Sequence, residues 1–169
     1  MKQMIMVALL VVAQLAVAGP AEVKPEMNRE RATKILESKD TVKKEKYISA
    51  LSDAAAEVAA ARGNSLSIKK ALLQGDADLL RLVFNAKEKR NAEMLSFIGD
   101  ASAGVKTTKE ASALAKIAEM NYTGNFKTEL TKAVENGKSL EEAIKAASKA
   151  IGKTGKDEIT LEKILDCLA

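Results

Sequence analysis

The chain has 169 residues, and its 27 lysines and arginines outnumber its 23 acidic residues, for a formal net charge of +4. It has no histidine and a single cysteine, which excludes histidine-based catalysis, histidine metal sites and a fold held together by intrachain disulfides. Charges of both signs are interspersed, and the two tyrosines and three phenylalanines stand apart from the basic clusters. The sequence therefore predicts no nucleic-acid surface.

Residues 1–18 have the features of a cleaved secretory signal peptide. Lys2 supplies a positive charge, residues 4–17 are apolar except for Gln14, and Ala16 and Ala18 match the small-x-small pattern that precedes a cleavage site. This apolar run is shorter than the roughly 18–20 residues that span a bilayer, so a cleaved signal is favoured over an uncleaved anchor. We expect a secreted protein, extracellular or, in a bacterium, periplasmic, in which residues 19–169 form a single helical domain.

Helix-forming residues dominate the chain after the signal, and its two prolines stand near the start of this part. Pro25 suits the first turn of a helix in residues 26–38. Asp40 offers a capping oxygen for a second helix, which is expected to end near Arg62 because Gly63 follows.

The second helix carries the clearest pattern in the sequence. Apolar residues recur on it with 4-3-4-3 spacing, which places them along one face. These residues are Tyr47, Leu51, Ala54, Val58 and Ala61. The seam covers less than two full heptads, so it predicts a helix–helix contact within the bundle and not a coiled-coil dimer.

A short helix is expected in residues 65–74, ending at Gly75. Residues 76–99 are apolar at both ends and polar in the middle, from Lys87 to Arg90. This pattern fits one long helix with an exposed middle equally well as two helices with a break between them, and both alternatives stay open.

Two capping-box patterns mark later helix starts. Thr107 and Glu110 open a helix that continues to about Met120, and Ser139 and Glu142 open another. Further helices are expected in residues 126–136 and at the C-terminus. The chain thus predicts seven or eight short amphipathic helices and no strand, which makes it an all-α protein with a compact bundle.

No group of residues has the composition and spacing of a catalytic or cofactor site. Acidic pairs such as Glu141 and Glu142 stand at helix starts, where the helix dipole accounts for them. The segment KDEITLEKIL resembles half of a calcium-binding loop in rhythm, but Asp157 takes the place of the required glycine and Lys163 that of the bidentate glutamate. We therefore expect no enzymatic activity, no metal and no cofactor.

Two residues are candidates for covalent modification. Asn121 begins an Asn-Tyr-Thr acceptor for N-glycosylation at an expected turn, although such triplets often arise by chance. Cys167 lies at the edge of an apolar stripe on the last helix, beside Ile164 and Lys163. The C-terminal end of a helix disfavours a thiolate nucleophile, which leaves a half-buried inert thiol or an intermolecular disulfide. Export favours the disulfide, and with it a protein partner or self-association.

These observations favour a secreted, non-enzymatic helical protein that acts by binding or structural association at a surface or in the extracellular space. One alternative is a carrier of an apolar small ligand, held in a cavity between helices. Its lining would come from Leu79, Val83, Phe84, Met94, Leu95, Phe97 and Ile98. The other alternative is a membrane-active protein that uses the amphipathic segments 41–62 and 139–151, although their alanine-rich apolar faces would insert weakly.

Overall fold

The computed structural model describes residues 26–121 and 125–167, and in these residues the chain forms helices and no strand. The expected signal peptide at residues 1–18 lies outside this part. The α-helices are α2 (Arg29–Leu36), α3 (Thr41–Val58), α4 (Asn64–Leu73), α5 (Ala77–Glu88), α6 (Ala92–Ser102), α7 (Thr108–Glu119), α8 (Phe126–Glu135), α9 (Leu140–Ala150) and α10 (Leu161–Asp166). A short 3₁₀ turn, η1 (Gly155–Asp157), precedes α10. The all-α class predicted from the sequence is confirmed.

Polar caps define most helix starts. The side chain at the N-cap accepts a hydrogen bond from the backbone N–H three residues later in seven of the described helices. These caps are Asn28, Asp40, Asp76, Asn91, Thr107, Ser139 and Thr160. Because each cap is encoded locally, the positions of these helices follow largely from the sequence.

The segment 76–99 contains two helices, with the break at the polar stretch. Arg90 adopts a left-handed backbone with φ of 53°, which an α-helix cannot accommodate. The next residue, Asn91, then caps α6 by accepting from the Met94 N–H at 3.1 Å. The described residues accordingly form nine α-helices, against the seven or eight expected.

The seam residues of the second helix lie along the border of its buried face. Leu51 is buried, whereas Tyr47, Ala54 and Val58 are half-buried. The helix ends at Val58, and the left-handed backbone at Ala60 (φ 54°) places half-buried Ala61 in the following turn. The deepest contacts come from an adjacent face, which consists of Ile48, Leu51, Ser52, Ala55 and Ala56.

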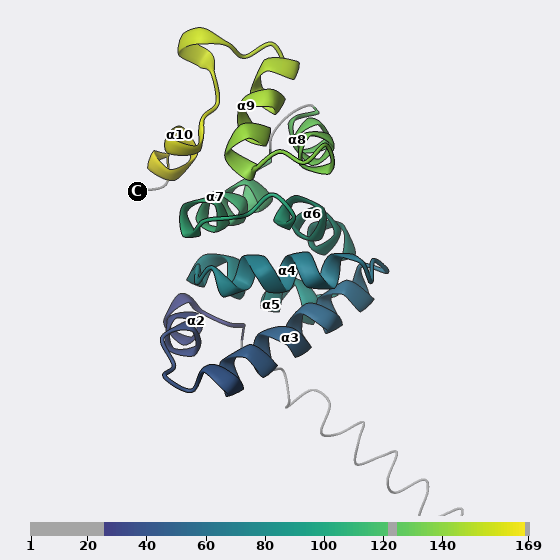
Figure 1. Cartoon of the computed structure of the whole chain (residues 1–169), viewed down its shortest axis with the longest axis vertical. Coiled ribbons are helices and arrows are strands. Elements are labelled where there is room, and N and C mark those ends of the chain that lie inside the picture. The colour runs from purple at the N-terminus through teal and green to yellow at the C-terminus, as the bar shows by residue number, and fades with distance from the viewer. Residues whose placement is uncertain (1–25, 122–124, 168–169) are drawn as a thin grey trace, which may run out of the picture.

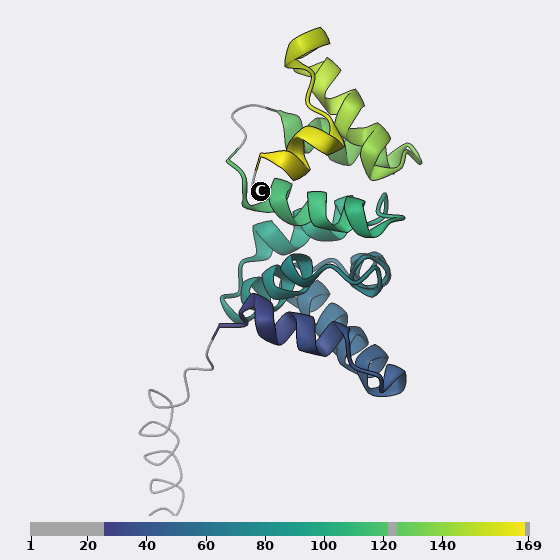
Figure 2. The ribbon, with the colours of Figure 1, turned by 90° about the vertical axis from the view of Figure 1, so that its left-hand side faces the viewer.

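The helices lie across the long axis of the molecule in successive layers (Figures 1 and 2). From one end to the other, α2 and α3 come first, then α4 and α5, then α6 and α7, and then α8 and α9. Neighbouring layers share one hydrophobic core. The last helix, α10, does not extend the stack but folds back to pack chiefly on α7.

Candidate functional site

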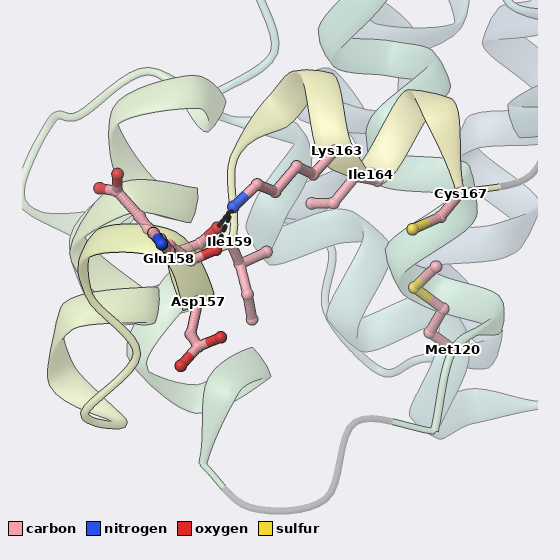
Figure 3. A pocket seen from close by; sticks show the side chains of 8 residues that line it. Met120, Asp157, Glu158, Ile159, Lys163, Ile164 and Cys167 are labelled. Atoms are coloured by element: carbon pink, nitrogen blue, oxygen red, sulfur yellow. Dashed lines mark hydrogen bonds between the residues drawn. The ribbon is translucent and has the colours of Figure 1, made fainter.

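A pocket of about 310 Å³ forms where α10 and the segment before it fold over the end of α7. Its walls bring together residues from three separate parts of the fold (Figure 3). They are Met120, Lys156, Asp157, Glu158, Ile159, Lys163, Ile164 and Cys167. Only Cys167 among them was singled out as a functional candidate from the sequence.

Ser148 fixes the path of the segment that forms one wall. This buried serine sits near the end of α9, and its hydroxyl donates to the Lys153 carbonyl at 2.7 Å. The same oxygen accepts from the Ile159 N–H at 2.7 Å. One side chain thereby joins α9 to both ends of the connection and turns the chain back toward α7.

Lys163 closes the wall from the other side. Its ammonium group donates to the backbone carbonyls of Lys156 at 2.8 Å and Glu158 at 2.7 Å (Figure 3). A positive charge therefore already satisfies the carbonyls of the segment that resembles a calcium loop. The described residues also contain no group of three or more acidic, cysteine or histidine side chains that could hold a metal ion.

Two kinds of contact hold α10 on α7. Leu161 and Ile164 are buried against the core, and the Lys116 ammonium of α7 donates to the Leu165 carbonyl at 2.7 Å. A cation at the end of a helix satisfies a carbonyl that has no partner within the helix. This fixes the C-terminal end of α10, where Cys167 lies.

Cys167 is exposed and occupies the C-cap position of α10. Its side chain and that of Met120 lie side by side at the rim of the pocket (Figure 3). Ile159 and Ile164 add apolar side chains to the lining of this pocket, and Lys156 and Asp157 add charged ones. The arrangement presents a thiol beside an apolar depression, which suits covalent or non-covalent association with another molecule.

Asn121 is exposed at the end of α7. It lines a second, smaller pocket of about 220 Å³ together with Met94, Phe97 and Lys127, whose ammonium lies 5.0 Å from the centre of the Phe97 ring. The other two residues of the glycosylation acceptor lie outside the described residues, so the modification stays a prediction.

Most residues expected to line a ligand cavity pack in the core instead. Leu79, Val83, Leu95 and Ile98 are fully buried, and Phe84 is nearly so. The other two, Met94 and Phe97, are partly exposed at the polar pocket beside Asn121. This placement favours ordinary helix packing as the reason for the stripe.

The segments considered for membrane activity contribute their apolar faces to the same core. In α9, for example, Leu140, Ala143, Ile144 and Ala147 are fully buried. Among the described residues, no helix combines the length and the apolarity that crossing a bilayer needs.

The sequence did not indicate that Met120 and Ile159 would line one pocket with Cys167, because this arrangement depends on the chain turning back after α9. The Ser148 hydrogen bonds that direct this turn carry no recognisable local signal. Comparison of the chain with protein-family models, with curated proteins and with solved structures finds no match in any of the three.

Proposed function

We propose that this chain is a secreted, non-enzymatic helical protein that acts by binding or structural association with a protein partner or a second copy of itself. The observation that carries the proposal is the exposed Cys167 beside the apolar depression of the C-terminal pocket. An exposed thiol tends to be oxidised after export. A neighbouring apolar surface would then stabilise the complex with the molecule that the thiol joins, because apolar area is buried between them.

The chemistry near the thiol supports association over catalysis. The chain has no histidine to act as a base. Of the two cations in the lining, Lys156 is next to Asp157 in the chain, and the Lys163 ammonium of α10 is occupied by two carbonyls. A nucleophile needs a positioned base or a stabilising charge, and this arrangement provides neither.

Non-reducing electrophoresis and native mass spectrometry of the mature protein test the proposal directly. We expect a disulfide-linked dimer or a mixed disulfide that reductant removes and that Cys167→Ser abolishes, with the helical circular dichroism unchanged. A chain that stays monomeric, and whose thiol reacts with labelling reagents only after unfolding, contradicts the proposal.

The proposal that this protein is not an enzyme has its own test. Purified mature protein is assayed against a broad panel of hydrolase substrates, and no turnover above background is expected. Turnover that a single point mutation abolishes overturns it.

A further inference from the structure

A second pocket, of about 330 Å³, lies at the end of the stack opposite α10, between α2 and the beginning of α3. It is distinct from the site on which the proposed function rests. Its lining is basic around the opening and apolar beneath it, and it comprises Arg31, Lys34, Ile35, Ser38, Lys43, Lys44 and Tyr47.

Four cationic side chains surround the opening, and their own contacts leave an excess of positive charge. Lys34 pairs with Glu30 at 2.7 Å and Lys43 with Asp40 at 3.6 Å, both on the surface where such pairs are weak. The Lys44 ammonium donates to the Leu36 carbonyl at 3.1 Å. Arg31 lies over the Phe84 ring, 5.5 Å from its centre. Glu88 adds a third carboxylate near Tyr47 and pairs with Lys87, so four cations still outnumber the carboxylates around the opening. Two of the four cations are held in place by uncharged groups.

The floor of the pocket is apolar. Ile35 and Tyr47 are partly buried and pack against the core. The Tyr47 hydroxyl is buried and has no hydrogen-bond partner among the described residues. Burial raises the pKa of Tyr47, so its phenol stays neutral. Because this oxygen has almost no exposed surface, the tyrosine offers a ligand its ring and not its hydroxyl.

Ser38 adds a hydroxyl at the turn between the two helices. Its oxygen accepts from the Asp40 N–H at 3.4 Å, while Asp40 itself caps α3 by accepting from the Lys43 N–H at 3.0 Å. The N–H groups of Asp40 and Lys43 therefore already have partners, and the side chains of the lining supply the positive charge at this pocket.

We propose that this pocket binds a monoalkyl phosphate, with the phosphate held by the cations of α2 and α3 and the alkyl chain lying on Ile35 and the Tyr47 ring. A phosphate carries about −1.5 to −2 charges near neutral pH and accepts several hydrogen bonds, which matches a ring of arginine and lysine better than a single carboxylate does. The apolar floor of the pocket provides a surface on which the alkyl chain of the ligand can lie. The same chemistry occurs in a free organic phosphate and in the headgroup region of an anionic lipid.

Titration of ¹⁵N-labelled protein with decyl phosphate, below its micelle concentration and at low salt, tests the proposal. We expect amide shift changes confined to α2 and the first turns of α3, with binding that weakens as salt is added. The double variant Arg31→Gln/Lys44→Gln should bind about tenfold more weakly or worse, because two charge-assisted contacts are lost. The matched control, Lys145→Gln/Lys149→Gln on α9, makes the same change in net charge and should bind as the wild type does.

Tyr47→Phe keeps the ring and removes only the hydroxyl, which has almost no exposed surface. We expect this variant to fold normally and to bind decyl phosphate as the wild type does, and a large loss of binding contradicts the placement of the alkyl chain on the ring.

Three further ligands decide what the pocket recognises. Decanol, which lacks the charge, and inorganic phosphate, which lacks the chain, should each bind far more weakly than decyl phosphate, and equal binding of either overturns the proposal. Anionic vesicles identify the lipid source if they shift the same amides as decyl phosphate. Binding to vesicles with no response to decyl phosphate overturns the proposal in favour of a membrane surface.

Discussion

At the residue scale, a few buried polar groups determine how the chain connects its helices. Glu110 is the clearest case, since it is 4% exposed and belongs to a sequence pattern that predicts a capping box. Its carboxylate accepts from the Thr107 hydroxyl at 3.1 Å but also turns inward to accept from the Glu141 N–H at 3.2 Å. It therefore caps α9 from α7. The sequence placed the helix start correctly, but a contact across 31 residues has no local signal.

Ser148→Ala should lower the free energy of unfolding by about 1–3 kcal/mol, because the half-buried Ile159 N–H loses its acceptor and the Lys153 carbonyl loses a donor. Ser52→Ala is the matched control. Ser52 is equally buried, but its hydroxyl only donates back to the Ile48 carbonyl of its own helix, so its loss should cost less than about 0.5 kcal/mol. Urea unfolding followed by circular dichroism measures both, and equal effects contradict this account.

Asp76 should make stability depend on pH. Burial raises the pKa of this carboxyl above its ordinary 3.8, although the Leu79 N–H bond opposes the shift. The folded state then binds the proton first, so this group adds stability as the pH falls from the raised pKa toward 3.8 and adds least at neutral pH. Asp76→Asn keeps a capping oxygen without the charge.

We therefore expect Asp76→Asn to be at least as stable as the wild type at neutral pH, with its advantage shrinking in acid. Urea unfolding at several pH values measures the difference. An Asn variant that is less stable by the same amount at every pH contradicts the expected role of burial.

At the scale of helices, small residues as well as apolar stripes determine how closely two helices pack. Gly99 on α6 faces Asn64 at the start of α4, and the Asn64 amide donates to the Asp100 carboxylate at 2.8 Å. A Cβ built on Gly99 would lie 2.6 Å from the Asn64 Cβ. The two helices can pack this closely only because residue 99 has no side chain.

Gly99→Ala should destabilise the protein by about 1–3 kcal/mol through this overlap, despite the higher helix propensity of alanine. Gly63→Ala provides the control, since its Cβ would meet nothing within 4 Å and its φ of −62° suits alanine. The control should be neutral or slightly stabilising. Thermal unfolding compares the two, and a stable Gly99→Ala protein shows that α4 can shift away.

The sequence predicted the helices well where caps and turns are local, as at Asp40 and Ser139. It left the break before Asn91 open, because a polar stretch such as residues 87–90 occurs on exposed helix faces as well as in turns. The packed face of α3 was harder still. Alanines occur on several sides of this helix, so an apolar stripe does not mark its buried face. The contacts with neighbouring helices determine that Ile48 and Ala55 face inward.

At the scale of the whole molecule, the layered arrangement separates the two pockets. The thiol and its apolar depression lie at α10, and the basic pocket lies at α2 and α3, at the other end of the stack. No periodicity in the sequence indicated either pocket, since each combines residues from helices whose relative placement depends on the turn or connection between them. The fold class could be predicted from composition and caps, but the sites could not.

A disulfide through Cys167 should leave the basic pocket free. We expect the oxidised dimer and the Cys167→Ser monomer to bind decyl phosphate with the same affinity per chain, measured by calorimetry. A large loss of binding in the dimer would show that the second copy covers α2 and α3, which the separation of the pockets argues against.

The return of α10 onto α7 also bears on how the protein opens. A helix of six residues is too short to be stable by itself, so α10 depends on the burial of Leu161 and Ile164 and on the Lys116 contact. Because α10 packs chiefly on α7, its detachment can leave the other layers in place. Amide hydrogen exchange should therefore show α10 losing protection well before α7. The helix that carries the thiol would then open and close on the bundle. A partner that forms a disulfide with Cys167 while α10 is detached would keep α10 away from α7.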